Sequence, residues 1–350
     1  METKRFHIHG TTGESTISIG EGLDQIQQFI PPGEFLIIAD ANVWEHHHQR
    51  FPDVTVIRLE AGEKNKNLAT VEMVYRNFLE HAADRSTFVV GVGGGVVCDI
   101  AGFAAATYMR GLRYGFVAST LLAQVDASVG GKNGVNFQGF KNLVGVFRQP
   151  EFVLCDLTLL DSLPESELIS GMGEVVKHAL IADAPLFDFL EENTPGALDR
   201  DPGVFQRMVI DSVRIKSRVV AQDEMEQGMR RILNFGHTVG HALEKLTHIQ
   251  HGAAVSVGMV AACRMSLLKG YLSPEDVERV ERLLHGLALP VSTPETPDHI
   301  MKAIVQDKKR VGDRIHFVFL TRIGETTVEE IPLNDLRAML SEVTNRANSR

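Results

Sequence analysis

The sequence predicts an α/β domain built on a parallel sheet, followed by an all-α domain. Over about the first 160 residues, short β-branched or apolar runs alternate with helical patterns. One run, 87–92, leads straight into three glycines and then a helix of small residues. Strand, glycine turn and helix in this order are typical of a Rossmann-like nucleotide-binding layer. After about residue 161 long amphipathic segments dominate, so we expect domains at 1–160 and 161–350, with the active site in the cleft between them.

The individual elements follow from hydrophobic periodicity and from helix-start signals. Short apolar runs predict strands in the first domain at 34–39, 55–59 and 87–92. Apolar residues at helical spacing predict a helix there at 67–82, and the small residues after the glycine turn predict one at 97–107. The second domain shows helical patterns at 164–181, 202–222, 238–246, 253–269, 274–286 and 298–307. Two of these helices open on a small polar residue followed by proline, as helix N-termini do: Ser273-Pro274 and Thr296-Pro297.

Composition excludes several classes of protein. The 350 residues carry 35 Lys+Arg against 45 Asp+Glu, a net charge of −10, which argues against a nucleic-acid partner. Three cysteines are too few for a disulfide scaffold and favour a reducing compartment. The longest apolar stretches fall short of the roughly 18 residues that a membrane span needs, and the first ten residues do not resemble a secretory signal. We therefore expect a cytoplasmic protein with no membrane partner.

The glycine run at 91–99 is the first candidate site. Glycines at the carboxyl end of a strand let backbone N–H groups approach a pyrophosphate, and the following helix N-terminus adds a favourable partial charge. The run lacks both the G-x-G-x-x-G spacing and the lysine-serine pair of a P-loop. A tight turn packed under a helix explains it equally well.

The stretch 119–142 has neither a helical nor a strand period. It contains an acid, Asp126, a glycine pair at 130–131, two lysines, Lys132 and Lys141, and Asn142. Lysines beside glycine turns suit a phosphate or carboxylate ligand, because the ammonium groups act as point charges where the backbone is open. The alternative is a solvated loop.

The second domain contains candidate metal ligands. Glu174, Lys177 and His178 share one helical face, and His237 and His241 are four residues apart on another. Such a histidine pair can chelate zinc, and His251 and Glu174 would complete a catalytic site with an open position. Iron and cobalt remain alternatives, as does a salt-bridged surface face.

Charged residues flank this histidine motif. Arg230, one helical turn before Asn234, can fork onto a substrate carboxylate, or else pair with Glu226. The basic turn 307–310 and the histidine run 46–48 are interpreted as solvated surface.

Six motifs in order give the chain its resemblance to a known family. They are GGGVVCD (93–99), STLLAQVDASVGGK (119–132), FKNLVG (140–145), GMGEVVKH (171–178), RRILNFGHTVGH (230–241) and HGAAVSVGM (251–259). Over nearly its whole length the chain thus resembles the 3-dehydroquinate synthase family. The resemblance implies a phosphorus–oxygen lyase of the shikimate pathway, which supplies aromatic amino acids. It implies conversion of 3-deoxy-arabino-heptulosonate 7-phosphate to 3-dehydroquinate and phosphate, by transient oxidation with NAD, β-elimination, re-reduction, ring opening and aldol closure.

The resemblance also implies the site residues. The ligands of one divalent metal ion, Zn²⁺ or Co²⁺, would be Glu174, His237 and His251, with His241 facing the substrate instead. The residues around NAD would be Asp40, Asn42, Glu63, Lys66, Gly94, Gly95, Val96, Asp99, Ser119, Thr120, Asp126, Lys132, Lys141, Leu159 and Ser162. The residues that meet the sugar phosphate would be Asp126, Lys132, Asn142, Lys177, Lys216, Glu226, Arg230, Asn234, His241 and Lys308. Arg110 would reach the phosphate site of a neighbouring subunit, which implies a homodimer.

The chain departs from the family pattern at a few positions. Asn133 stands where threonine is expected, and Cys98 where glycine is frequent. The segment 136–140 lacks the usual proline-leucine-glycine, and Ser119-Thr120 replaces a Pro-Thr or Thr-Thr pair. The charged positions are all kept.

Three alternatives remain on the sequence alone. The first is a cyclase acting on sedoheptulose 7-phosphate or glucose 6-phosphate, which would share the fold, NAD and metal. The second is a metal-dependent polyol dehydrogenase of the glycerol dehydrogenase type, and the third a non-catalytic homologue. We favour the synthase because Arg230, Asn234 and His241 are retained, and a substrate carboxylate needs such donors.

Overall fold

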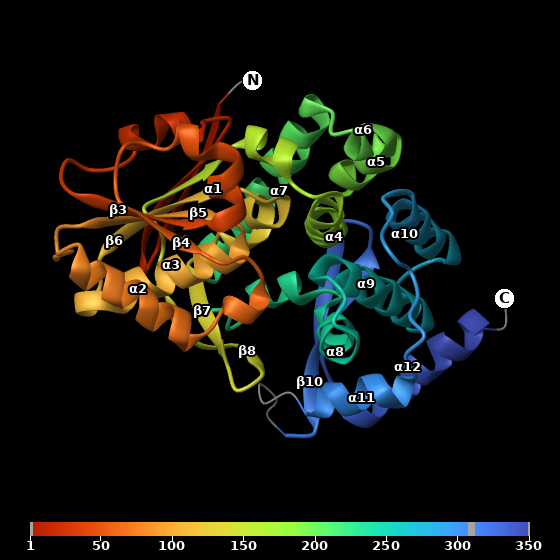
Figure 1. The fold of residues 1–350 in the computed structure, drawn as a ribbon. Helices are drawn as coiled ribbons and strands as arrows, with labels where there is room; N and C mark the ends of the chain where they lie inside the picture. Colours follow the sequence, from red (N-terminus) through yellow and green to blue (C-terminus); the bar gives the residue numbers. More distant parts are fainter. Residues whose placement is uncertain (1–2, 307–311, 349–350) are drawn as a thin grey trace. The chain divides into compact units, whose positions relative to one another are not determined.

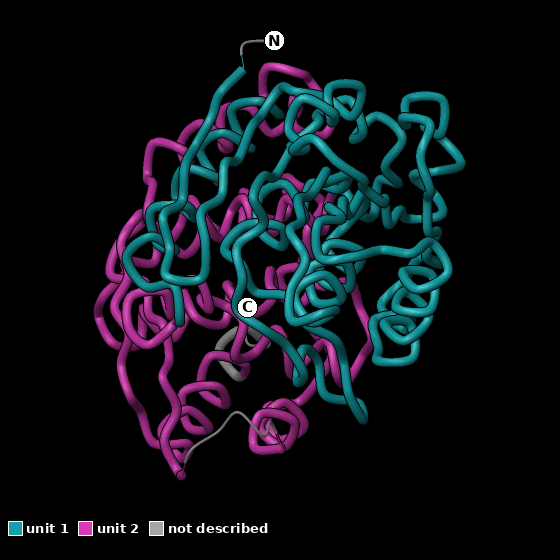
Figure 2. The backbone as a smooth tube through the Cα atoms, turned by 90° about the vertical axis from the view of Figure 1, so that its left-hand side faces the viewer, with its two compact units in different colours: residues 1–168, 205–225 teal, residues 169–204, 226–350 magenta. Residues whose placement is uncertain are grey.

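The computed structural model describes residues 3–306 and 312–348, and the chain forms two compact units. Unit 1 comprises residues 1–168 and 205–225, and unit 2 residues 169–204 and 226–350 (Figure 2). This division differs from the expected single boundary near residue 160. Residues 205–225 group with the N-terminal residues because Lys216 forms an ion pair with Asp126, and because Glu224 accepts hydrogen bonds from Thr11 and Thr12.

Unit 1 is built on a seven-stranded sheet in the order β1-β2-β9-β6-β5-β3-β4. All neighbouring strands are parallel except the β1–β2 pair. The strands are β1 (Lys4–Gly10), β2 (Gly13–Ile19), β3 (Phe35–Asp40), β4 (Val56–Leu59), β5 (Phe88–Gly93), β6 (Arg113–Ala118) and β9 (Phe152–Cys155). Every residue of β5 is buried, as expected of a central parallel strand covered on both faces. The predicted parallel sheet is confirmed.

Helices from the N-terminal part of the chain lie around this sheet (Figure 1). They are α1 (Ala41–His47), α2 (Leu68–Glu80) and α3 (Gly95–Thr107). Asn67 caps α2 through its side chain, which accepts from the Thr70 amide, and this cap explains why the helix begins there. Helix α3 has no apolar stripe because most of its residues are small and buried.

The stretch 119–142 contains both helical and strand residues and is not a simple loop. It contains a short π-helical turn, Ala123–Ala127, and the first strand of a hairpin, β7 (Lys132–Phe137) with β8 (Phe140–Phe147). Gly134 and Gly145 face each other in this hairpin, and a Cβ on either would lie within 2.8 Å of the partner backbone. The sequence shows no strand period here because glycines interrupt the hairpin and most β8 side chains are exposed, so apolar and polar residues do not alternate.

Unit 2 is mainly helical. Its helices are α4 (Glu165–Ala182), α5 (Ala184–Glu192), α6 (Thr194–Leu198), α8 (His237–Thr247), α9 (His251–Leu268), α10 (Pro274–Gly286), α11 (Pro297–Val305) and α12 (Leu333–Asn348). Helix α7 (Pro202–Gln222) forms most of the segment 205–225, which belongs to unit 1. One feature corrects the all-α expectation: an antiparallel hairpin, β10 (Arg314–Arg322) with β11 (Glu325–Pro332), whose buried residues include Phe317 and Phe319.

Helix α9 alone among the described helices has the length and composition of a membrane span, with a mean hydropathy of 1.3. The sequence alone predicted that the apolar part of this helix is too short to span a membrane. Two thirds of the window, 67%, is buried inside the fold, as in a core helix.

Candidate active site

Close helix packing in unit 2 brings three candidate ligands together. A Cβ on Gly252 of α9 would lie 1.9 Å from the Ser170 carbonyl oxygen of α4, and one on Gly258 would lie 1.9 Å from the Gly236 carbonyl oxygen. No side chain fits at either position, so α9 lies directly against α4 and against the start of α8. Helix α4 carries Glu174, α9 begins at His251, and α8 begins at His237.

The donor atoms of these residues are spaced as metal ligands are. Glu174 Oε1 lies 3.2 Å from His251 Nε2 and 3.5 Å from His237 Nε2. Two ligands about 2.0–2.1 Å from a tetrahedral zinc ion are themselves about 3.3 Å apart. One carboxylate and two imidazoles therefore fit a single Zn²⁺ or Co²⁺ ion and leave a fourth position open.

The second nitrogen of each histidine has its own acceptor. His237 Nδ1 lies 3.1 Å from the Phe235 carbonyl oxygen, and His251 Nδ1 lies 3.4 Å from Glu244 Oε2. Both acceptors keep a hydrogen on Nδ1, so Nε2 is the nitrogen of each ring that faces Glu174 and is left to bind a metal ion. The sequence analysis missed Glu244. Its position seven residues after His237, on the same helical face, is the signal that could have indicated it.

His241 does not join this ligand set. Its ring lies 5.0 Å from that of His237, but its donor atom groups with Glu244 and His251 and not with Glu174. The four-residue histidine spacing therefore does not make the chelating pair that spacing alone suggested. The geometry instead favours the ligand set that the resemblance implied.

Lys177 places a buried positive charge beside the ligands. Its Nζ forms an ion pair with Glu174 Oε2, and both side chains are buried. Burial alone would raise the pKa of Glu174, but Lys177 and His251 hold it well below its usual range. Burial and Lys177 also lower the pKa of His237 well below its usual value. Burial opposes the charge on His251, yet Glu174 and Glu244 raise its pKa to about 9.

The candidate cofactor residues of unit 1 line one edge of the sheet. Asp40 is the last residue of β3, Gly94 follows β5, and Ser119 follows β6, whose neighbours in the sheet include β5. The Ser119 amide donates to the Gly93 carbonyl at 2.9 Å, which holds two of these strand ends together. Ligands of open parallel sheets bind outside the carboxyl ends of the strands. The structure therefore brings these residues together at the edge where a nucleotide is expected.

Two glycines allow close packing at the start of α3. Gly94 caps the N-terminus of α3, where a Cβ would lie 2.9 Å from Thr120 Cγ2, and one on Gly95 would lie 2.8 Å from Ala127 Cβ. The predicted Val96 belongs to the first turn of the same helix. Glycine at both positions therefore lets the start of α3 pack closely against Thr120 and Ala127, and the first turn offers the N–H groups of a helix N-terminus, where pyrophosphates bind.

Two charged pairs flank this edge. Lys66 and Asp99 form a largely buried ion pair, and Lys216 of α7 donates to the Asp126 side chain and carbonyl, both at 2.5 Å. Burial would lower the pKa of Lys66, but Asp99 and Glu63 raise it, while burial raises the pKa of Asp99. Burial likewise raises the pKa of Asp40, whose carboxylate accepts from the Asn42 amide.

Two further candidate cofactor residues follow β9. Leu159 is buried, and Ser162 Oγ lies 2.8 Å from His47 Nε2 of α1. His47 belongs to the histidine run that the sequence analysis interpreted as solvated surface, so one of its members contacts a candidate site residue.

The remaining candidate substrate residues of unit 2 lie on the turn before α8. Arg230 is 2% exposed, and Asn234 Nδ2 donates to Glu226 Oε1 at 2.6 Å. Glu226 thus orients the asparagine amide. Next to Arg230, Arg231 Nη1 lies 3.0 Å from His316 Nε2 of the β10–β11 hairpin.

The remaining candidate residues include several on exposed segments. Arg110 is exposed, in a turn where both it and Met109 have positive φ. Lys141 and Asn142 are exposed on β8. Lys308 lies outside the described residues. Asn133, a departure from the family pattern, is buried and its amide donates to Tyr114 Oη, the Gly131 carbonyl and the Arg148 carbonyl, so it ties the hairpin base to β6.

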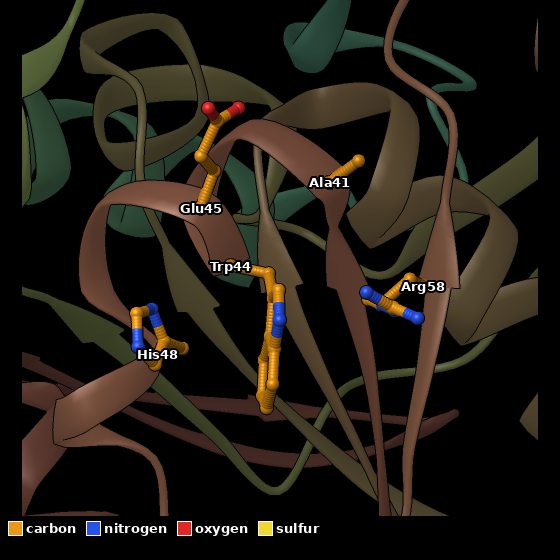
Figure 3. A pocket seen from close by; sticks show the side chains of 5 residues that line it. All are labelled: Ala41, Trp44, Glu45, His48 and Arg58. Carbon is orange, nitrogen blue, oxygen red and sulfur yellow. The ribbon is translucent and has the colours of Figure 1, made fainter.

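A surface pocket of about 420 Å³ lies elsewhere on unit 1. Figure 3 shows its lining, made by Ala41, Trp44, Glu45, His48 and Arg58. The Arg58 guanidinium lies 6.0 Å from the Trp44 ring. None of the candidate site residues lines this pocket, so it adds nothing to the candidate active site.

Comparisons with known proteins agree along the chain. Residues 56–170 match the model of the 3-dehydroquinate synthase N-terminal domain, and residues 171–310 match that of the C-terminal domain. A 3-dehydroquinate synthase from Geobacter sp. (strain M21) is 44% identical over 291 residues, which cover 82% of this chain and 80% of the relative.

Two solved structures share the fold, and the predicted fold class is confirmed. A 2-epi-5-epi-valiolone synthase from Streptomyces hygroscopicus subsp. jinggangensis 5008, with NAD⁺ and Zn²⁺ bound, is 27% identical with a TM-score of 0.86, covering 94% of this chain and 96% of its own. A 2-deoxy-scyllo-inosose synthase, complexed with carbaglucose-6-phosphate, NAD⁺ and Co²⁺, is 26% identical with a TM-score of 0.85, covering 97% and 100%. With both of its halves matched by family models and a relative at 44% identity, this chain belongs to the 3-dehydroquinate synthase family.

Proposed function

We propose that this protein converts 3-deoxy-arabino-heptulosonate 7-phosphate to 3-dehydroquinate and phosphate, using NAD and one divalent metal ion, Zn²⁺ or Co²⁺. The observation that carries the proposal is the donor set of the buried Glu174 with His237 and His251, in a chain 44% identical to a 3-dehydroquinate synthase. The solved relatives that bind NAD⁺ with Zn²⁺ or Co²⁺ support both cofactors.

Glu174, His237 and His251 would hold the metal ion. When bound, such an ion acidifies a coordinated substrate hydroxyl, as it lowers the pKa of coordinated water to about 7. The chain prepares the site: Phe235 and Glu244 orient the two imidazoles, and Lys177 compensates the buried charge of Glu174.

The carboxyl edge of the unit 1 sheet would hold NAD, whose nicotinamide accepts and returns a hydride. The pyrophosphate would lie at the α3 N-terminus, which begins at Gly94 and Gly95. Asp40 and Asp99 supply carboxylates for ribose hydroxyls, and the ion pair with Lys66 orients Asp99.

The basic residues would bind and orient the substrate. Lys132, Lys216 and Asn142 would meet the sugar phosphate, and Asp126 fixes the Lys216 ammonium through two hydrogen bonds. Arg230 and Asn234 would hold the carboxylate, for which a guanidinium fork and an amide are matched donors. These groups stabilise developing charge on the leaving phosphate, and removing one such donor typically raises the barrier by about 3 kcal/mol.

We further propose that the enzyme is a cytoplasmic homodimer in which Arg110 serves the neighbouring subunit. Arg110 is exposed, so its guanidinium is accessible to a second copy of the chain. All three cysteines are free and buried, which fits a reducing compartment.

A cyclase acting on sedoheptulose 7-phosphate or glucose 6-phosphate is the second candidate. The two solved cyclases support it through their fold, but they are only 26–27% identical to this chain. The buried Arg230, suited to a carboxylate that neither rival substrate carries, favours the heptulosonate.

A phosphate-release assay across the three sugar phosphates tests the proposal. With NAD and Zn²⁺ or Co²⁺, the heptulosonate should release inorganic phosphate without net accumulation of NADH at 340 nm. Release from another sugar phosphate in preference would identify the cyclase, and stoichiometric NADH would identify a polyol dehydrogenase.

A further inference from the structure

One side chain of unit 1 contacts two candidate site residues of different kinds. Asn136, near the end of β7, donates from Nδ2 to Glu63 Oε1 at 2.8 Å. Its Oδ1 accepts from the Asn142 amide at 2.9 Å. Glu63 belongs to the proposed NAD site, and Asn142 to the proposed phosphate site. A single amide group therefore joins the cofactor side to the substrate side.

The two contacts require both ends of an amide. A carboxylate accepts only, so Glu63 needs a donor, whereas the Asn142 amide needs an acceptor. Turning the Asn136 amide around would set oxygen against carboxylate and NH₂ against N–H, which fixes its orientation. Aspartate at this position would keep the contact with Asn142 and lose the one with Glu63. Alanine would lose both.

The backbone of Asn136 is anchored to the same cofactor segment. Its amide donates to the Lys66 carbonyl at 2.9 Å, and Asn136 pairs with Asn67 in an isolated parallel bridge. Lys66 itself forms the ion pair with Asp99. A two-stranded hairpin is only marginally stable by itself, so such anchors decide where the tip of the β7–β8 hairpin lies.

Asn142 needs this support because of its backbone. Its φ is +50°, in the left-handed region, which few residues with a side chain adopt and which asparagine tolerates better than most. Asn142 is also exposed, so packing does not hold it. The hydrogen bond from its amide to Asn136 Oδ1 selects the left-handed conformation and thereby sets the direction of the side chain.

We propose that Asn136 is a positioning residue that couples Glu63 to Asn142, so that NAD binding and sugar-phosphate binding depend on one side chain. The proposal rests on the proposed function, since that function assigns the two partners their roles. Asn136 itself touches neither ligand. It acts by orienting a carboxylate on one side and a backbone amide on the other.

Two substitutions separate the two contacts. In Asn136→Asp, the dissociation constant for NAD, measured by calorimetry on metal-loaded protein, should rise roughly tenfold, as for neighbours coupled through one contact. The substrate KM at saturating NAD should stay near the wild-type value. In Asn136→Ala the NAD dissociation constant should rise as well, and the substrate KM should rise about fivefold, the effect of one lost hydrogen bond.

A matched control and a paired variant exclude trivial explanations. Gln138→Glu adds the same charge to an exposed position of the same hairpin and should leave both constants unchanged. In the double variant Asn136→Asp with Glu63→Gln, the glutamine can donate to the aspartate. The double variant should therefore bind NAD no more weakly than Glu63→Gln alone, which a general loss of hairpin structure would not produce.

The outcomes are distinct. An Asn136→Ala variant that melts like wild type and keeps both constants within twofold overturns the inference. An Asn136→Asp variant that behaves like Gln138→Glu overturns the inferred role of the contact between Asn136 and Glu63. Wild-type protein that binds NAD but forms no product overturns the proposed function, while the NAD dissociation constants still decide about Asn136. Wild-type protein that binds no NAD overturns both.

Discussion

Glu244 contacts His251 at the ring nitrogen that faces away from Glu174. His251 Nδ1 lies 3.4 Å from Glu244 Oε2, while its Nε2 lies 3.2 Å from Glu174 Oε1. The imidazole therefore lies between two carboxylates, one a proposed metal ligand and the other its support. Such outer carboxylates fix the ring orientation and raise the basicity of the ligand.

Glu244→Gln is expected to weaken metal binding without abolishing it. The glutamine keeps the size of the side chain but loses the charge that supports His251, and losses of this kind are typically about 10–100-fold in affinity. Competition with a zinc chelator measures the change. Glu278→Gln, an exposed substitution on α10, is the matched control. Equal metal affinity in wild type and Glu244→Gln would remove Glu244 from the site.

Glu174→Gln should lose both the metal and part of the stability. Lys177, whose side chain is 1% exposed, would be left as a buried charge without its carboxylate. Breaking a buried ion pair from one side costs about 3–5 kcal/mol. Metal analysis of purified protein and urea unfolding of the metal-free form check the two effects separately. The exposed Glu192→Gln should change neither, and a metal-replete Glu174→Gln protein would refute the ligand assignment.

Gly258→Ala should disturb the metal site although it changes no ligand. The added Cβ would lie 1.9 Å from the Gly236 carbonyl, next to His237, so α9 and the start of α8 must separate. Overpacking of this kind costs about 1–3 kcal/mol. Thermal unfolding and metal content should both fall. Gly286→Ala, where the nearest neighbour is a methyl group at 3.3 Å, is the comparison. If both variants melt alike, close helix packing does not limit this site.

Glu224 should make stability depend on pH in the acid range. Hydrogen bonds from Thr12, Gln149 and Thr11 outweigh burial and lower its pKa from 4.5 to about 2. A lowered folded-state pKa means that the stabilisation is complete above about pH 4.5 and is lost as the pH falls toward 2.

Glu224→Gln, which resembles the protonated acid, should therefore lower the urea midpoint at pH 7. The difference from wild type should shrink between pH 4.5 and pH 2, the window set by the two pKa values. Asp201→Asn, just before α7, is a second acid-to-amide substitution for comparison, because the Asp201 carboxylate also accepts from a backbone amide, that of Val204. A difference that stays constant with pH would show that Glu224 acts through packing and not through its charge.

Local signals in the sequence were sufficient for many elements. The helices predicted at 202–222 and 274–286 match α7 and α10 residue for residue, because caps, proline positions and amphipathic spacing lie within the helices themselves. The run of strand, glycines and helix from residue 87 was also found, since it combines a continuous apolar strand with its turn. Strands β1, β7 and β8 were not predicted, because exposed residues or glycines interrupt the apolar alternation that indicates a strand.

The sequence by itself determined the alternation of strands and helices that makes a parallel sheet, the positions of the glycines, and the family motifs that contain Glu174, His237 and His251. Only the tertiary structure decided which of them meet. The spacing of His237 and His241 suggested a pair, but the close approach of α4, α8 and α9 sets the distances from Glu174 to His237 and His251. Glu244 and Asn136 gained their roles in the same way. Contacts between residues far apart in the chain depend on how the elements pack, and local periodicity does not predict that packing.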